Sequence, residues 1–392
     1  MVLKALTGNY AVALAAKMAR VNVVSAYPIT PQTSIVEKLA EYIDRGELDA
    51  EIIRVESEHS ALAAVFGAAV AGARVFTATS SHGLLYMHEW VHWVSRARIP
   101  LVMAIVTRTI GAPWNIWPDH SDFMDQRDTG WVMCFGMDNQ EVFDLTLQAF
   151  RISEDPRVYL PVMIGLEGFI LGHTTMPVDV PEQKAVDEWL GPRTQGYVID
   201  GSTSLSLGNL AWPEDTEEMF MDIQRALEEA KKVIREVDDS FGKAFGRRYG
   251  GLVSKYKCED AKYHIVSMGA WSGDIMEAVD KLRSEGYTVG LIRIRFMRPF
   301  PDEDVCQTLS GSRGVIVFDR AISFGSMGPL YLDVAGSLLK HGVVPRYIRN
   351  VIAGIGGVNV THEEFANIVK NTIEKLEGGE EPPRITWYHA RR

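Results

Sequence analysis

Short apolar runs alternate with amphipathic segments in the first third of this chain, and no other feature constrains its fold as strongly. The apolar runs are typical of buried strands, and apolar side chains at helical spacing are typical of helices. Thr7 is a suitable N-cap for the first helix. Because strands that alternate with helices pair in parallel, we expect a doubly wound α/β sheet. We predict strands at 21–26, 52–55, 74–78 and 101–106, and helices at 7–19, 33–45, 58–71 and 83–95.

The same alternation returns in the last third of the chain, behind an irregular stretch at 172–216 that is rich in Pro, Asp and Gly. A long segment in between has Ile223, Leu227, Ala230 and Ile234 at helical spacing, which predicts a connecting helix from about Asp215. We therefore divide the chain into a first domain that includes this helix, a linker and a smaller α/β domain. Their predicted bounds are 1–241, 242–256 and 257–392.

For the smaller domain the alternation predicts four strands and four helices. The strands are predicted at 264–268, 289–295, 314–319 and 347–352, and the helices at 273–285, 302–309, 328–341 and 362–376.

Charge and cysteine content exclude several classes of protein. With 40 basic and 51 acidic side chains the net charge is −11, which suits neither nucleic acid nor an anionic membrane as a partner. Cys134, Cys258 and Cys306 lie far apart, which excludes a disulfide framework and a sequence-local iron–sulfur site. Since no segment has the pattern of a signal peptide or a membrane span, we expect a cytoplasmic protein.

One motif indicates a metal site. His88, Glu89 and His92 match HExxH on a predicted helix, where two histidines can bind zinc and the glutamate can act as general base. The usual continuation with a third histidine is absent. A zinc hydrolase is therefore the alternative of another class, against the simpler interpretation that these side chains pack under the sheet.

No phosphate-binding loop of the usual kinds is present. The stretch Gly354-Ile355-Gly356-Gly357 could offer backbone N–H groups to an anion, or it could only turn the chain after a strand. The chain therefore has no self-sufficient nucleotide site in its sequence.

Three polar side chains stand where predicted strands end. Thr30 lies in a proline-flanked loop after 21–26, Glu58 follows 52–55, and Arg108 follows 101–106. Ligands of open α/β sheets bind at this edge, so we expect the three to share a crevice. A guanidinium and a hydroxyl suit a small carboxylate substrate. Taken singly, Glu58 could serve only the helix dipole and Arg108 only a surface ion pair.

Motifs over roughly 330 residues resemble those of the α subunit of the 2-oxoacid:ferredoxin oxidoreductases, most closely the pyruvate (pyruvate synthase) type. Their order along the chain argues against chance. In order they are Tyr27-Pro28-Ile29-Thr30-Pro31, Glu56-Ser57-Glu58, Thr79-Ser80-Ser81-His82-Gly83-Leu84, Arg108 with 111–117, 126–131, Arg298-Pro299-Phe300-Pro301 and Gly354-Ile355-Gly356-Gly357 through Thr361.

The resemblance implies a pyrimidine-binding thiamine diphosphate domain followed by a domain like the transketolase C-terminal domain. It implies oxidative decarboxylation of a 2-oxoacid with coenzyme A to acyl-CoA, carbon dioxide and reduced ferredoxin, in anaerobic metabolism. In that family a β subunit holds the diphosphate, its Mg²⁺ and an iron–sulfur cluster. Subunits γ and δ, the latter ferredoxin-like, complete the hetero-oligomer. We therefore expect ferredoxin or a similar acceptor as partner and no metal site in this chain.

The resemblance also assigns roles to single residues. Glu58 matches the glutamate that bonds the pyrimidine N1′ of the cofactor, and it is the predicted catalytic residue. Thr30 and Arg108 match the contacts to the substrate carboxylate. The remaining predicted substrate residues are Tyr27, Pro28 and Ile29, and the remaining predicted cofactor residues are Pro28, Ser81, His82 and Gly83.

His82 departs from the family pattern, which has Gln at this position. Its imidazole could add a proton donor near the cofactor, or it could only fill space.

The substrate itself stays open at this point. Pyruvate comes first because of the overall resemblance, and an aryl or branched-chain 2-oxoacid such as phenylglyoxylate comes second. Trp90, Trp93, Trp114 and Trp117 flank Arg108, where they could pack against the sheet or line the pocket with apolar walls. A non-catalytic interaction subunit is a third possibility, against which the joint presence of Glu58, Thr30 and Arg108 counts.

Overall fold

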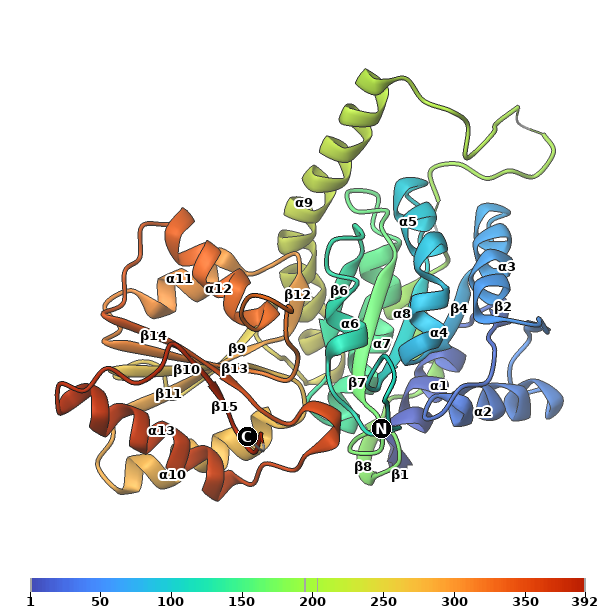
Figure 1. Cartoon of the computed structure of the whole chain (residues 1–392). Coiled ribbons are helices and arrows are strands. Elements are labelled where there is room, and N and C mark those ends of the chain that lie inside the picture. Colours follow the sequence, from blue (N-terminus) through green and yellow to red (C-terminus); the bar gives the residue numbers. More distant parts are fainter. Residues whose placement is uncertain (1, 194, 203, 391–392) are drawn as a thin grey trace.

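A computed structural model describes residues 2–193, 195–202 and 204–390, and its main feature is a pair of sheets (Figure 1). The first sheet has the order β12-β6-β7-β5-β4-β2-β3, and only β12 runs antiparallel to its neighbour. Because β2 lies between β3 and β4, the chain winds in both directions from it, as predicted. The strands are β2 (Val23–Ser25), β3 (Glu51–Ile53), β4 (Val75–Thr79), β5 (Val102–Thr107), β6 (Val132–Phe135), β7 (Val162–Glu167) and β12 (Phe296–Arg298).

Helices pack on both faces of this sheet. Thr7 caps the first one as expected, since its hydroxyl accepts the N–H of Tyr10 at 3.2 Å, a contact worth about 1 kcal/mol. One buried cluster includes side chains of α1 (Gly8–Met18), α2 (Thr33–Asp44), α7 (Asn139–Ser153), α8 (Gln183–Leu190) and α9 (Pro213–Phe245). The other includes α3 (Glu58–Val70), α4 (Ser81–Tyr86), α5 (His88–Arg96) and α6 (Ser121–Met124).

The predicted helix 83–95 is wrong in one respect, because it consists of the two helices α4 and α5. At Met87 the backbone ψ is −10° instead of about −42°, which tightens the turn and separates them. The irregular stretch 172–216 also contains regular structure, namely α8 and β8 (Thr175–Val180). Strand β8 pairs antiparallel with β1 (Val2–Thr7), a partner too distant in sequence to leave a local signal.

The second sheet has the order β15-β14-β13-β10-β11-β9. The predicted strands and helices of this region are confirmed within one or two residues at each end, while β9, β12 and β15 were not predicted. The further strands are β9 (Val253–Tyr256), β10 (Tyr263–Met268), β11 (Val289–Ile294), β13 (Gly314–Asp319), β14 (Tyr347–Ile352) and β15 (Ile385–Trp387). The helices are α10 (Ser272–Ser284), α11 (Asp302–Leu309), α12 (Pro329–Lys340) and α13 (His362–Glu377), with a short 3₁₀ turn at Ile355–Gly357.

A single residue separates a strand of one sheet from a strand of the other. Strand β11 ends at Ile294, Arg295 follows, and β12 then pairs with β6 of the first sheet. The expected linker 242–256 likewise contains the end of α9 and the whole of β9. One apolar cluster extends from α3 and α5 into α11 and α12, so the core is continuous across both sheets. The exact domain boundaries stay a prediction.

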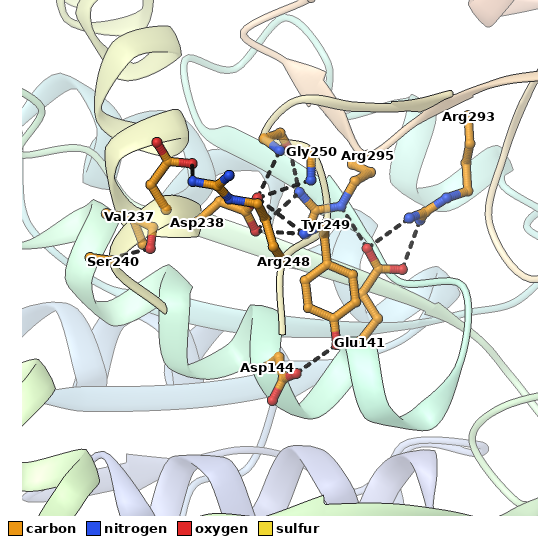
Figure 2. Close-up of polar contacts among 12 residues, drawn as sticks. Glu141, Asp144, Val237, Asp238, Ser240, Arg248, Tyr249, Gly250, Arg293 and Arg295 are labelled. Carbon is orange, nitrogen blue, oxygen red and sulfur yellow. Dashed lines mark hydrogen bonds and ion pairs between the residues drawn. The ribbon is translucent and has the colours of Figure 1, made fainter. Parts of the chain in front are cut away.

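Buried charges fix this junction, as Figure 2 shows. The carboxylate of Glu141 accepts from Arg293 Nη1 at 2.7 Å and from Arg295 Nε at 2.6 Å. Burial disfavours the charged carboxylate, but the two guanidinium groups outweigh it and hold the pKa of Glu141 at about 2. Nearby, Asp238 Oδ2 accepts the N–H groups of Gly250 and Gly251, both at 3.0 Å. The two sheets are therefore joined by a paired ionic contact as well as by apolar packing.

Among the described residues, every helix lacks the combination of length and apolar character that crossing a membrane requires.

Candidate active site

The carboxyl ends of β2, β3, β4 and β5 meet at one edge of the first sheet, at its switch point. Each strand is followed there by one of the predicted site segments. The loop after β2 contains Thr30, α3 after β3 begins with Glu58, the turn after β4 contains Ser81 and His82, and Arg108 follows β5 directly. The parallel register thus brings together residues that lie up to 78 positions apart.

Glu58 begins α3 because Ser57 caps that helix, its hydroxyl accepting the N–H of Ser60 at 3.2 Å. The Glu58 side chain is 9% exposed and lies against Gly83. A Cβ at position 83 would come within 2.7 Å of Glu58 Oε1 and 2.5 Å of Thr79 Oγ1, so only glycine fits there. The predicted catalytic carboxyl and the predicted glycine are therefore in direct contact.

Arg108 is 4% exposed and is held from three sides. Its Nη1 donates to the backbone oxygen of Thr30 at 2.6 Å, its Nη2 lies 3.2 Å from His82 Nδ1, and the Trp114 ring covers the guanidinium at 4.8 Å. Burial lowers the pKa of Arg108, although the carboxyl groups of Asp122 and Glu58 oppose this effect. Its Nε has no hydrogen-bond partner among the described residues. The guanidinium is thus fixed in place with donor capacity to spare for an anion.

Asp122 positions this corner of the site, and the sequence analysis missed it. Its Oδ2 accepts the backbone N–H of Ser81 at 2.8 Å and of Arg108 at 3.0 Å, which ties the ends of β4 and β5 together. Burial raises the pKa of Asp122 to about 8. Ser81 adopts a φ of 47°, an unfavourable conformation for a non-glycine residue that this contact helps to hold. The sequence signal was weak, because one aspartate among several acidic residues at 119–128 does not indicate which groups its carboxylate accepts from.

The loop 109–117 connects the site to the second sheet. Asn115 Nδ2 donates to the backbone oxygen of Gly356 at 3.2 Å, and the Gly356 N–H donates to Asp119 at 3.2 Å. Gly357 has a positive φ of 81° and packs against Trp117, leaving no room for a Cβ. The glycine stretch 354–357 thus turns the chain and packs against the loop 109–117. Because N–H groups of this stretch are already bonded within the protein, they argue against an anion site. A cleft of about 670 Å³ opens between this loop and the second domain.

Six of the predicted site residues lie together in the structure, and the other three lie at the margin of this group. Thr30 meets Arg108 through its backbone oxygen, while its side chain is exposed. Tyr27 and Pro28 are exposed on the same loop, and Ile29 is half-buried beside them. The grouped residues are Thr30, Glu58, Ser81, His82, Gly83 and Arg108. Their roles stay predictions.

The four tryptophans flanking Arg108 have different environments. Trp114 alone of the four lies over Arg108; the residue is 54% exposed, and its ring centroid is 5.8 Å from that of His82. Trp90 and Trp93 line a separate apolar cavity of about 660 Å³, and Trp117 packs against Phe169 at 4.9 Å. Of the four tryptophans, therefore, Trp114 is the one placed at the Arg108 crevice, and the other three lie elsewhere.

Several buried polar atoms at this edge have no hydrogen-bond partner in the described parts of the chain. They belong to residues at the carboxyl ends of β4 and β5, and one of them, Thr79 Oγ1, lies beside Gly83 and Glu58. Buried polar groups are normally bonded, so such a concentration is typical of a site that a ligand completes. The Ser81 hydroxyl is already used, because it donates to the backbone oxygen of Thr109. The neighbouring unpartnered groups are therefore better placed to bond a cofactor. The atoms are Thr79 Oγ1, Ser80 Oγ, Thr107 Oγ1 and Arg108 Nε.

The HExxH segment does not form a metal site. His88 Nδ1 lies 2.8 Å from Gln126 Oε1, and His88 and His92 face one another at 3.3 Å through their Nε2 atoms. Glu89 is turned away toward His59, at 3.3 Å. Within the described ranges, no group of three or more histidine, cysteine or acidic side chains is arranged to hold a metal. The zinc-hydrolase alternative therefore has no support.

Comparison with known families agrees with this geometry. A family model described as pyruvate flavodoxin/ferredoxin oxidoreductase, thiamine diP-bdg, matches residues 14–239, and one described as pyruvate:ferredoxin oxidoreductase core domain II matches residues 261–365. The first match includes every predicted site residue.

Curated relatives match over nearly their whole length. The ketoisovalerate oxidoreductase subunit VorA of Pyrococcus horikoshii is 45% identical over 390 residues, which is 99% of this chain and 98% of the relative. The pyruvate synthase subunit PorA of Methanocaldococcus jannaschii is 45% identical over 377 residues, which is 95% of each chain.

Among solved structures, a 2-oxoglutarate:ferredoxin oxidoreductase from Magnetococcus marinus with 2-oxoglutarate, coenzyme A and succinyl-CoA bound aligns with a TM-score of 0.71. The alignment covers 95% of this chain and 65% of that chain, at 19% identity. A likeness at this identity supports the fold alone.

Proposed function

Because this chain belongs to the 2-oxoacid:ferredoxin oxidoreductase family and contains its thiamine diphosphate-binding domain, we propose that it is the α subunit of an enzyme that oxidatively decarboxylates a 2-oxoacid. The products are acyl-CoA, carbon dioxide and reduced ferredoxin. The observation that supports this most directly is the crevice in which a buried carboxyl, Glu58, and a buried guanidinium, Arg108, meet beside unpartnered polar atoms.

Each residue of the crevice has a role in this proposal. Arg108, fixed by the backbone oxygen of Thr30, binds the substrate carboxylate through its free donor capacity. Glu58, Gly83 and the unpartnered hydroxyls of Thr79 and Ser80 would hold the pyrimidine end of thiamine diphosphate. When bound, this cofactor supplies the nucleophilic carbon and the electron sink that the decarboxylation requires. Glu58 then holds or releases a proton at its carboxyl oxygen, which is general acid–base catalysis.

Partner subunits supply what this chain lacks in this proposal. A β subunit would hold the diphosphate, Mg²⁺ and an iron–sulfur cluster, and γ and ferredoxin-like δ subunits would pass electrons to ferredoxin or a similar acceptor. In support, the described cysteines Cys134, Cys258 and Cys306 are all buried and far apart in sequence.

For the substrate we favour a branched-chain 2-oxoacid over pyruvate, with an aryl 2-oxoacid as the further alternative. The half-exposed Trp114 ring stands over the carboxylate-binding guanidinium and offers a flat apolar wall next to it. An isopropyl group can bury area against such a wall, whereas the single methyl group of pyruvate gains less. Pyruvate, first on the sequence resemblance, becomes the second candidate.

The test is kcat/KM of the whole complex for pyruvate, 2-oxoisovalerate and phenylglyoxylate with a viologen acceptor. We expect 2-oxoisovalerate to exceed pyruvate by about tenfold, which corresponds to about 1.4 kcal/mol. A comparable preference for pyruvate would reject the role of Trp114. Turnover of none of the three would reject the assignment of Arg108 and Thr30.

A further inference from the structure

The His82 ring lies between the Arg108 guanidinium and the loop 109–117, and it contacts both. Its Nδ1 is 3.2 Å from Arg108 Nη2, and its Nε2 accepts the backbone N–H of Gly111 at 3.1 Å. The ring also makes a T-shaped contact with Trp114, which stands over the same guanidinium. A substitution at His82 would therefore affect both the carboxylate-binding guanidinium of Arg108 and the Trp114 wall of the pocket.

Each ring nitrogen faces an N–H group that can only donate. A guanidinium N–H and a backbone N–H have no lone pair to offer, and a neutral imidazole accepts at one nitrogen only. Of the contacts that the described residues make to this ring, only Ser81 Oγ, 3.4 Å from Nδ1, can accept a proton. The ring therefore satisfies either Arg108 or Gly111 at one time, depending on its tautomer.

The two tautomers correspond to two states of the site. With the proton on Nδ1, His82 donates weakly to Ser81, holds the loop through Gly111, and leaves Arg108 Nη2 free for a substrate carboxylate. With the proton on Nε2, the ring accepts from Arg108 and lets the Gly111 N–H go. Occupation of Arg108 by a carboxylate thus favours the tautomer that keeps the Gly111 N–H bonded.

Protonation removes both states. An imidazolium has N–H on both nitrogens, so neither Arg108 nor Gly111 finds an acceptor, and two cations then stand 3.2 Å apart. Nearby charged or titratable groups on the surrounding elements include Glu58 on α3, Asp122 on α6 and Asp119, which follows the loop. Asp122 directs its oxygens to backbone N–H groups of Ser81, Arg108 and Phe123, and Glu58 lies against Gly83, so neither is bonded to this ring.

We propose that His82 is a positioning residue which, as a neutral acceptor, couples substrate binding at Arg108 to the hydrogen bond that holds Gly111 of the loop 109–117. Protonation of the ring releases both contacts. This inference rests on the proposed function, in which Arg108 binds the substrate carboxylate.

The experiment measures KM and kcat of the complete complex at pH 8 and pH 5.5 with its preferred 2-oxoacid. Protonation on acidification removes the acceptor, so an effect that needs the neutral ring raises KM about tenfold between these values. We expect this rise in KM for the unaltered complex, with a smaller change in kcat. A complex with His82→Gln keeps an acceptor that cannot become charged, and its KM should change less than about threefold.

Two further variants separate this role from a structural one. His82→Leu has no acceptor, so its KM should be raised about tenfold at both pH values. His362→Gln alters an exposed imidazole at the start of α13 and should keep the pH response of the unaltered complex.

Equal pH responses of KM in the unaltered complex and in His82→Gln would overturn the inference. So would a KM that falls on acidification, since it would mean that the charged ring helps to bind the carboxylate. If instead the unaltered complex turned over no 2-oxoacid at all, the proposed function would fail, and not only the role of His82.

Discussion

Two regions of this molecule bury charged side chains, and they differ in how these charges are paired. At the junction of the sheets, Glu141 bonds Arg293 and Arg295, and Asp238 accepts backbone N–H groups (Figure 2). At the ends of β4 and β5, by contrast, Arg108 Nε and three threonine or serine hydroxyls have no partner within the described residues. In the first region most buried polar groups are bonded within the protein, with Arg295 Nη2 an exception among the described residues, while the second region leaves a group of them available.

The difference separates a structural network from a functional one. A buried ion pair contributes little net stability, but removing one partner is costly because a charge is left unpaired. Unpartnered buried donors cost free energy as well, and a protein retains them where a ligand satisfies them. Changes at the junction should therefore affect stability and leave the chemistry intact, and changes in the crevice should do the reverse.

The largest effect is expected for Glu58→Gln. An amide cannot exchange a proton with the cofactor, so turnover of the complex should fall by at least about a thousandfold, while the volume of the side chain is conserved. The measurement is proton exchange at the reactive cofactor carbon, followed by NMR in the reconstituted complex. Glu56→Gln is the matched control, because Glu56 is exposed and two residues away. If Glu58→Gln exchanged the proton as fast as the unaltered complex, Glu58 would have no catalytic role and would only stabilise the start of α3.

At the junction we expect Glu141→Gln to lower the free energy of unfolding by about 3–5 kcal/mol, because it leaves two buried guanidinium groups without their charge partner. Urea denaturation followed by circular dichroism measures this. Glu236→Gln breaks an exposed pair with Arg157 and should cost less than about 1 kcal/mol. Loss of turnover in the folded Glu141→Gln complex would contradict the division between the two regions.

The junction should also weaken in acid. The pKa of Glu141, about 2, lies below its ordinary value of 4.5, so its contribution is present above pH 4.5 and is lost as the pH falls toward 2. This change amounts to roughly 3 kcal/mol. Unfolding curves recorded at pH 6 and pH 3 should show roughly two thirds of this loss in the unaltered protein, and a smaller loss in Glu141→Gln. An equal loss in both would assign acid sensitivity to other carboxyl groups.

The smallest expected effect concerns Trp114, which belongs to the crevice. Trp114→Ala removes the apolar wall over Arg108 and should lower kcat/KM for 2-oxoisovalerate relative to pyruvate by about 1 kcal/mol, roughly fivefold. Trp93→Ala, which alters a partly exposed tryptophan in a separate cavity, is the control and should leave this ratio unchanged. An unchanged ratio in Trp114→Ala would move the source of specificity to a partner subunit.

Much of the fold and part of the site could be predicted from local patterns. The alternation of apolar runs and amphipathic segments predicted the doubly wound sheet, because periodicity reports which face of a segment is buried. Placing Thr30, Glu58 and Arg108 after three strands predicted a shared crevice, because parallel strands end at the same edge. These inferences need no knowledge of which strands are neighbours.

Tertiary structure alone decided what depends on contacts between distant segments. Strand β12 crosses to the first sheet, Asp122 bonds the ends of β4 and β5, and Trp114 rather than Trp90 or Trp93 covers Arg108. Each depends on the partner that a side chain or strand meets after folding, and the same residue types at the same spacing are compatible with other partners. Sequence therefore determined the elements and the edge at which the site forms, and packing determined which groups were bonded and which were left free.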